Sequence, residues 1–479
     1  MRISELKPNS IWKHFETINA IPRASTKEEQ IIEYMIAFGE SLNLETVADA
    51  TGNVIIKKPG TSGRENDNAV VLQGHLDMVH QKTVTSNFDF DTQGIEMFID
   101  EDWVKAKETT LGADNGIGVS VIMAVLSSEN IQHPPIEALF TIDEEMGMTG
   151  AMALTKDQLK GKILLNLDSE EDDEITIGCA GGVDVEITGN YNLEKVNNDF
   201  QYYEISVSGL SGGHSGVDIH LNHGNAIRIF ANYLLALKKE VAIKVSKILA
   251  GTLTNVIPRD LTSTIAIRKT DVSEFEKIHK SIVAAIQAKY QSTDKNLDIT
   301  IKLIEGSLSV VENNFLHQLL EGIQKMPNGV FSMTEGMDDL VQTSNSIAKI
   351  KLQEGRFSIA CHTRSSVDAE RDVVVQKIRE SFPIGKTEEI GPYPGWEPNP
   401  KSKLLSIAKK CYQEINGVTP AVKSIHAGLE CGIISEIYPR MEMISFGPNI
   451  LGAHSPEERL QISSTQKFWK FLTSLLQKL

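Results

Sequence analysis

The sequence predicts an α/β protein with a mostly parallel central sheet and an inserted α+β domain of two ferredoxin-like lobes. Apolar strands alternate with helical patterns in the first third of the chain. After about residue 190 the order becomes strand-helix-strand-strand-helix-strand, which is typical of a ferredoxin-like lobe. The chain of 479 residues is also too long to fold around one hydrophobic core of ordinary size. We therefore expect a discontinuous first domain, residues 1–187 and 392–479, and an inserted second domain, residues 188–391.

The predicted strands of the first domain end in side chains that can do chemistry. Helical spacing predicts helices over residues 27–42 and 115–127, and an apolar run predicts a buried strand at 69–73. The segments EALFTIDEE and KILLNLDSE are each an apolar strand followed by carboxylates. A parallel sheet gathers ligand sites at the carboxyl ends of its strands. The motifs QGHLDM, TIDEE and NLDSE therefore predict a functional site at that edge.

The inserted domain follows from a second set of patterns. Its expected elements are a strand at 203–207, a glycine-rich loop at 209–216, helices at 223–239 and 273–290, and a strand at 297–304. Residues 345–390 partly repeat the scheme, which predicts a second lobe. The segment GPYPGWEPNP is rich in proline and glycine and is the expected linker back to the first domain.

Charge and cysteine usage exclude several classes of function. The net charge of -17, from 47 basic and 64 acidic residues, provides no basic surface for nucleic acid or an anionic membrane. Four cysteines without a CxxC pair argue against a disulfide framework or a zinc ribbon. The N-terminus lacks the pattern of a signal peptide, and no run approaches the ~20 apolar residues of a membrane span. We expect a cytoplasmic protein.

Two histidines and several carboxylates are candidate metal ligands. They are His75 and Asp77 in GHLDM, Asp114 in LGADNGIG, Glu144 and Glu145 in TIDEEMG, Asp168 in NLDSE, and His454 in GAHSPEE. This set of donors suits zinc, and also cobalt or manganese. Two neighbouring ions need a bridging carboxylate, and hydrolysis needs a further carboxylate that is not a ligand. The adjacent Glu144 and Glu145 could divide these two roles.

Each of these residues also has an ordinary structural interpretation. An isolated histidine near a strand end is usually structural, but the motifs around His75 and His454 favour metal ligation. The glycines of LGADNGIGV do not match the GxGxxG dinucleotide pattern. Cys179 and Cys431 are expected to be small core residues rather than nucleophiles.

The motif order GHLDM, GADNG, DEE, NLDSE, GAHSPEE resembles the co-catalytic-zinc metallopeptidases related to carboxypeptidase G and to carnosinase. With GLSGGHSG, TNVIPR and HAGLECG included, nearly the whole chain is similar to the bacterial aminoacyl-histidine dipeptidases. The resemblance implies a zinc-peptidase-like catalytic domain, two divalent metal ions and hydrolysis of Xaa-His dipeptides such as carnosine by a metal-activated water. It leaves open whether the chain forms a homodimer or is a monomer whose doubled lobe mimics one.

The resemblance also implies how the two metal sites are divided. Asp114 would bridge the ions, with His75 and Asp168 completing one site and Glu145 and His454 the other. The Asp114-Asn115 peptide bond would be cis.

Two further carboxylates have roles in the family outside direct ligation. Glu144 would act as general base and then protonate the leaving amine. Asp77 would hydrogen-bond the imidazole of His75 and so fix its orientation.

The inserted domain would supply the residues that contact substrate. The resemblance implies that His214 stabilises the oxyanion, although a turn residue that caps a helix is the alternative. Asn255 and Arg364 would bind the dipeptide, with Arg364 holding its C-terminal carboxylate. Arg268 is a competing candidate for that carboxylate. The dipeptide would lie between the domains, whose closure would exclude water and longer peptides.

Two rival functions share the same motifs. An acylase or deacetylase would act on N-acyl amino acids with the same metal ligands. A catalytically inactive peptide-binding homologue would keep the scaffold, but it should first lose Glu144, and this carboxylate is present.

Overall fold

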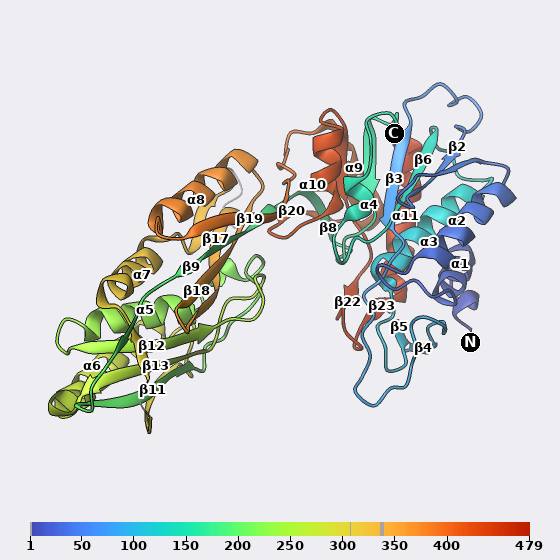
Figure 1. Ribbon diagram of the computed structural model, residues 1–479. Coiled ribbons are helices and arrows are strands. Elements are labelled where there is room, and N and C mark those ends of the chain that lie inside the picture. Colours follow the sequence, from blue (N-terminus) through green and yellow to red (C-terminus); the bar gives the residue numbers. More distant parts are fainter. Residues whose placement is uncertain (1, 307, 336–339) are drawn as a thin grey trace. The chain divides into compact units, whose positions relative to one another are not determined.

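The chain folds into two compact units, each with its own sheet (Figure 1). The computed structural model describes residues 2–306, 308–335 and 340–479. Unit 1 comprises Met1–Gly178, Trp396–Ser424 and Leu429–Leu479, and unit 2 comprises Cys179–Gly395 and Ile425–Gly428.

The short segment Ile425–Gly428 differs from the sequence-based expectation, which assigned it to the first domain. It packs with unit 2 because the Ala180 N–H donates to the carbonyl oxygens of Ile425 and Ala427. The ring of His426 also lies 2.7 Å from the Ser344 hydroxyl. These contacts join residues far apart in the sequence, and no local pattern predicts them.

Unit 1 contains an eight-stranded sheet in the order β1-β2-β6-β3-β7-β21-β8-β20. Its strands are β1 (Glu45–Ala48), β2 (Val54–Lys58), β3 (Val70–His75), β6 (Ile136–Thr141), β7 (Ile163–Asn166), β8 (Glu174–Cys179), β20 (Ala421–Ile425) and β21 (Glu442–Ser445). The central strands β6, β3, β7 and β21 are parallel, as predicted. Strand β2 is antiparallel to β6, and strand β8 is antiparallel to β21.

Helices cover this sheet and bury its apolar residues. They are α1 (Asn9–Asn19), α2 (Glu29–Ser41), α3 (Ala113–Ser127), α4 (Thr149–Met152), α9 (Lys403–Asn416), α10 (Glu430–Ile437) and α11 (Ile462–Lys478), with a 3-10 turn η1 (Ile3–Glu5). Helix α1 packs on α3, α3 on β3, and α9 on α11. Leu72, Phe140 and Leu165 of neighbouring strands join Ile122 of α3 and Phe471 of α11 in one core. The predicted buried helix at 115–127 is thus confirmed as α3.

A second, four-stranded sheet lies in unit 1, in the order β22-β23-β5-β4. Its strands are β4 (Met97–Asp100), β5 (Trp103–Ala106), β22 (Ile450–Leu451) and β23 (Arg459–Gln461). Because β22 and β23 pair with each other, the loop that joins them is held at both ends. This loop carries His454.

Unit 2 is built on one large sheet in the order β14-β11-β13-β12-β17-β18-β9-β19, with β16 paired to β17. Its strands are β9 (Gly181–Asn190), β11 (Phe200–Ser208), β12 (Ile243–Ala250), β13 (Leu261–Arg268), β14 (Asp298–Ile304), β16 (Gly329–Met333), β17 (Val341–Gln353), β18 (Arg356–Ser365) and β19 (Lys386–Tyr393). The remaining elements are α5 (Ala226–Leu237), α6 (Val272–Tyr290), α7 (Asn313–Lys325), α8 (Asp368–Ser381), η2 (Ile219–Leu221), η3 (Lys269–Asp271), and the paired β10 (Leu193–Lys195) and β15 (Ser309–Val311).

The two predicted ferredoxin-like lobes are confirmed in unit 2, but their chain order is not the simple tandem expected. The first lobe runs β11-α5-β12-β13-α6-β14 and has the spatial order β14-β11-β13-β12. The second lobe has the equivalent order β19-β9-β18-β17. Its first strand, β9, precedes the first lobe, which is therefore inserted into the second. The expected domain start at residue 188 falls inside β9, whose partners β18 and β19 lie more than 160 residues further on.

The lobes are joined edge to edge. Strand β12 of the first pairs with β17 of the second, in antiparallel register from Ile248 with Leu352 to Ala250 with Ile350. In the described part of the chain, no helix has the length and apolarity to span a membrane.

Candidate metal centre

The carboxyl ends of three neighbouring parallel strands bring the candidate ligands of unit 1 together. His75 is the last residue of β3, Glu144 and Glu145 follow β6, and Asp168 follows β7. Asp114 is contributed by the first turn of α3. The Asp114-Asn115 peptide bond is cis, as the resemblance implies.

His454 reaches the same place from the loop between β22 and β23. Its backbone has φ 62°, in the left-handed region that non-glycine side chains seldom adopt. Such a conformation persists only where surrounding contacts hold it, and it is frequent at functional sites. The side chain is 54% exposed, whereas that of His75 is 1% exposed. The His454 ring thus stands at the open side of the cluster.

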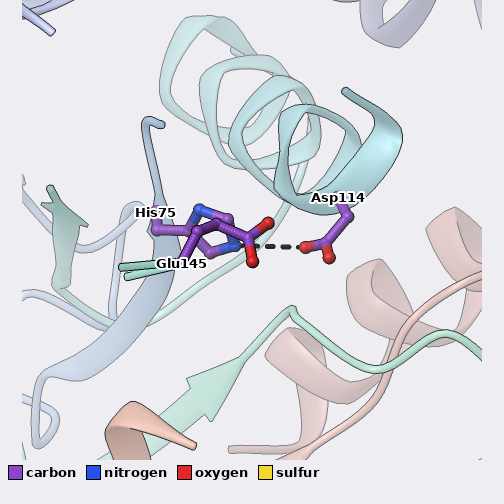
Figure 2. Close-up of side chains that lie close together, drawn as sticks. All are labelled: His75, Asp114 and Glu145. Carbon is purple, nitrogen blue, oxygen red and sulfur yellow. Dashed lines mark hydrogen bonds and ion pairs between the residues drawn. The ribbon is translucent and has the colours of Figure 1, made fainter. Parts of the chain in front are cut away.

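The carboxylate of Asp114 uses its two oxygens in two directions. Its Oδ1 lies 3.1 Å from Nε2 of His75, an approach visible in Figure 2. Its Oδ2 lies 3.2 Å from Nε2 of His454. Each imidazole nitrogen also faces a second carboxylate: His75 Nε2 is 3.3 Å from Asp168 Oδ1, and His454 Nε2 is 3.0 Å from Glu145 Oε2. One carboxylate is thus shared by two groups of donors.

These spacings fit ligands of divalent cations. Two donors at about 2.1 Å from one ion lie about 3.0–3.4 Å apart when the angle between them is near 90–109°. The four nitrogen-to-oxygen distances all fall in that range. A donor atom from each of His75, Asp114 and Glu145 lies within 4.8 Å of the others. In addition, the buried Glu145 Oε1 has no hydrogen-bond partner among the described residues, although a buried carboxylate oxygen normally has one.

The protonation of the cluster supports the same interpretation. Burial raises the pKa of Asp168 to about 7 although His75 opposes it, and burial raises the pKa of Glu170 to about 8. Hydrogen bonds to Asp114 and Glu145 raise the pKa of His454 to about 11. The metal-free site therefore holds extra protons. Divalent cations would displace them, because metal ligands bind in their deprotonated forms.

Asp77 contacts both the candidate ligand His75 and the backbone of Glu144 and Glu145. Its Oδ1 lies 3.3 Å from Nδ1 of His75, so the ring nitrogen away from the cluster faces a carboxylate. The same side chain accepts the backbone N–H groups of Glu144 and Glu145, at 3.1 and 3.3 Å, and the Ser25 hydroxyl at 2.8 Å. Asp77 thereby orients His75 and also fixes the backbone on which both glutamates stand.

The carboxyl group of Glu144 is left available for chemistry. Among the described residues it forms neither an ion pair nor a side-chain hydrogen bond. Burial raises its pKa well above the usual range, an effect that His75 opposes and the neighbouring carboxylates Asp168 and Glu145 reinforce. A carboxylate with a raised pKa beside a cluster of ligands is suited to accept and return a proton.

Two buried residues that the sequence does not single out bind the backbone next to this cluster. Glu458, 2% exposed, accepts backbone N–H groups at the start of α3, and Arg23, 2% exposed, donates to carbonyl oxygens beside His75 and Asp114. Glu458 lies four residues after His454 in GAHSPEE, a motif that the sequence analysis singles out for its histidine alone. Nothing in the local sequence marks Arg23.

Unit 2 brings its own predicted residues together. The loop 209–216 carries His214, and its N–H and carbonyl groups pair with the segment around Asn255: the Ser215 N–H donates to Asn255 O at 2.8 Å. Asn255 is exposed. Arg364, near the end of β18, places its Nη2 3.5 Å from Nε2 of His214.

The hydrogen bonds of His214 determine which of its nitrogens carries the proton. Its Nδ1 accepts the N–H groups of Gly216 and Val217, at 3.1 and 3.0 Å. Burial and then the charge of Arg364 lower its pKa to about 4, so the ring is neutral at pH 7. The proton must therefore lie on Nε2. Nδ1 thus holds the turn that follows His214, and Nε2 carries a proton that the Arg364 guanidinium, itself a donor, does not accept.

Arg364 and Arg268 differ sharply in surroundings. Arg364 is 5% exposed, its Nη1 donates to the Tyr393 hydroxyl at 3.0 Å, and its buried Nε has no hydrogen-bond partner among the described residues. Arg268 is exposed and lies over the ring of Phe200. A buried guanidinium with unused donors favours Arg364 as the carboxylate-binding residue.

The chain is similar to known peptidases. A family model described as peptidase family M28 matches residues 53–202, and one described as a peptidase dimerisation domain matches residues 205–294. The chain is 36% identical over 479 residues to the cytosol non-specific dipeptidase of Escherichia coli (strain K12), covering 100% of this chain and 99% of that protein.

Solved structures show the same relationship. Aminoacylhistidine dipeptidase from Vibrio alginolyticus superposes with a TM-score of 0.94 at 36% identity, covering 100% of this chain and 98% of that one. Aminopeptidase PepT from Bacillus cereus ATCC 10987, with a TM-score of 0.57 and 16% identity over 99% of both chains, shares the fold. With this identity along its whole length, the chain belongs to the family of metal-dependent dipeptidases that includes the E. coli enzyme.

Proposed function

We propose that the protein is a dipeptidase that uses two divalent metal ions, zinc being the proposed metal, to hydrolyse Xaa-His and related dipeptides such as β-alanyl-histidine. The observation that carries the proposal is the shared carboxylate of Asp114, with His75 and Asp168 on one side and Glu145 and His454 on the other. This is the donor arrangement that two neighbouring ions require.

The substrate class rests on the relatives. The Vibrio relative is named for aminoacyl-histidine dipeptides, whereas the E. coli relative is named non-specific. We therefore propose a preference for a C-terminal histidine rather than a strict requirement. The name of the E. coli relative supports a cytoplasmic location, and the match to a dimerisation domain supports a homodimer.

The proposed mechanism assigns one step to each residue. When bound, the metal ions polarise the scissile carbonyl and lower the pKa of the attacking water. Glu144 takes the proton of that water and returns it to the departing nitrogen. Asp77 keeps Glu144 in place through its backbone N–H, as well as orienting His75.

The proposed substrate contacts come from unit 2. His214 donates its Nε2–H to the oxygen that becomes negatively charged. Arg364 binds the C-terminal carboxylate of the dipeptide through donors that the protein does not use. Asn255, exposed beside the His214 loop, is a second polar contact for the peptide.

A substrate panel tests the function. With added zinc, the purified protein should hydrolyse β-alanyl-histidine and other Xaa-His dipeptides and leave N-acetyl-histidine intact, as followed by release of free histidine. An acylase would show the reverse order. Turnover of N-acetyl amino acids without any dipeptide turnover would contradict the proposal.

The control for this panel is Glu144→Gln, prepared in the same way. It should keep its metal content but lose about 10²–10⁴-fold in kcat, because the amide cannot take the proton. The matched exposed variant Glu129→Gln should keep full activity. Activity that survives in Glu144→Gln would show that another group is the base.

Arg364→Lys tests the carboxylate contact. Lysine keeps the charge but loses the paired donors, so KM for dipeptides should rise by about 10- to 100-fold with a smaller change in kcat. Dipeptide amides, which lack the carboxylate, should be much less affected. Arg268→Lys is the matched control with an unchanged KM. A raised KM in Arg268→Lys alone would transfer the role to Arg268.

The raised pKa values predict how pH affects the metal-free protein. Asp168 has a pKa of about 7 when folded, against 3.8 for an ordinary aspartate, so the folded state binds more protons than the unfolded state between these values. Its contribution to stability is therefore complete below about pH 4 and is lost as the pH rises through about 7. The urea midpoint of chelator-treated protein should fall from pH 5 to pH 8.

Two comparisons isolate the metal site in that experiment. Adding zinc should reduce the fall, because the bound ions replace the protons. The variant Asp168→Asn, which cannot titrate, should show a smaller fall without zinc. A midpoint that rises from pH 5 to pH 8 in the metal-free protein would contradict the assignment.

A further inference from the structure

We infer that Glu458 and Arg23 are positioning residues of the metal centre, which together fix the backbone that presents Asp114 and His75 to the ions. Neither side chain is placed as a ligand. The inference rests on the proposed two-metal function and concerns what keeps the donors at the spacings that such a centre needs.

Glu458 gathers four consecutive N–H groups onto one carboxylate. Its Oε2 accepts from Leu111 and Gly112, at 2.7 and 2.9 Å, and its Oε1 accepts from Ala113 and Asp114, at 2.7 and 3.3 Å. The last of these is the N–H of the shared ligand itself. Because all four donors belong to one short segment, the carboxylate fixes the path of the chain up to Asp114.

Glu458 also belongs to the loop that carries His454. Strand β23 begins at the residue after Glu458. Because β23 pairs with β22, sheet hydrogen bonds hold both ends of the loop that carries His454 and Glu458. The hydrogen bonds that Glu458 accepts therefore set the spacing between Asp114 and His454. In the structure, Asp114 Oδ2 lies 3.2 Å from His454 Nε2.

Arg23 connects the same segment to the strand end that carries His75. Its Nη2 donates to Gly112 O at 2.5 Å, and its Nη1 donates to Leu76 O and Asp77 O at 3.1 and 3.0 Å. The planar guanidinium can bridge two backbone segments at once, whereas an ammonium group is a single point of contact. Arg23 thus sets the spacing between Asp114 and His75.

The glycines of LGADNGIG show how closely the backbone lies on this arginine. Gly112 has φ 68°, and a Cβ added there would lie 2.5 Å from Arg23 Nη2. A Cβ at Gly116 would lie 2.6 Å from the same atom. Gly112 and Gly116, two of the three glycines that could suggest a nucleotide loop, instead allow the chain to lie against Arg23.

A simpler interpretation is that Glu458 only caps α3. The first N–H groups of a helix lack partners within the helix, and a carboxylate there stabilises it. That role predicts a loss of stability alone. The positioning role predicts in addition a loss of metal affinity, because displaced donors bind an ion less well.

Metal titration separates the two interpretations. In Glu458→Gln the amide nitrogen faces N–H donors, so the segment 111–114 should shift. Zinc affinity of the metal-free protein, measured by competition with a chelating dye, should fall by about 10- to 100-fold for at least one ion. The visible spectrum of the cobalt-loaded protein should change, and kcat should fall more than KM rises.

The matched control is Glu137→Gln. Glu137 is also buried and accepts two backbone N–H groups, those of Lys160 and Gly161, but it lies at the opposite end of its strand from Glu144. It should lose stability without losing zinc affinity. Arg23→Lys should weaken zinc binding as Glu458→Gln does, and it decides the question if Glu458→Gln does not fold.

The outcomes are distinct. Zinc affinities within about twofold of the wild type in a folded Glu458→Gln or Arg23→Lys would overturn the inference, because second-layer partners of metal ligands normally matter more than that. Wild-type protein that binds no zinc in the same titration would refute the metal centre itself, and the inference with it. Weakened binding in both variants with an unaffected Glu137→Gln would support it.

Discussion

The candidate metal centre of unit 1 depends on the carboxylate of Asp114, which both imidazoles contact. Its oxygens face two imidazoles, and each imidazole faces a second carboxylate. In the absence of cations such a buried group of acids can persist only by retaining protons, which is why the pKa of Asp168 is raised. The two divalent ions that we propose would remove that cost and would supply the chemistry of hydrolysis. The stability of the metal-free protein therefore favours protonated carboxyl groups at this site, whereas metal binding needs the same groups deprotonated.

The fold meets these demands by joining rigid elements at one point. Parallel strands β3, β6 and β7 deliver His75, the two glutamates and Asp168 from neighbouring ends. Helix α3 delivers Asp114, and the loop held between β22 and β23 delivers His454. The buried pair Glu458 and Arg23 connects these pieces through backbone groups. Accurate spacing thus comes from backbone contacts as much as from the ligands.

The sequence predicted the parts of this arrangement that depend on local patterns. Apolar strands ending in QGHLDM, TIDEE and NLDSE indicated where ligands would gather, and the helix at 115–127 was visible from its glycines and apolar run. The domain boundary expected at residue 188 falls inside strand β9, because the partners of this strand lie far along the chain and no local pattern marks it. The sequence does not identify Arg23 for the same reason. Its guanidinium binds carbonyl oxygens of distant residues, which come near it only in the folded chain.

The most direct test of the account is a crystal structure of the zinc-loaded protein with anomalous scattering recorded at the zinc edge. We expect two peaks, one on each side of the Asp114 carboxylate, the first beside His75 and Asp168 and the second beside Glu145 and His454. A single peak, or two peaks with Asp114 bound to only one of them, would contradict the shared-carboxylate centre.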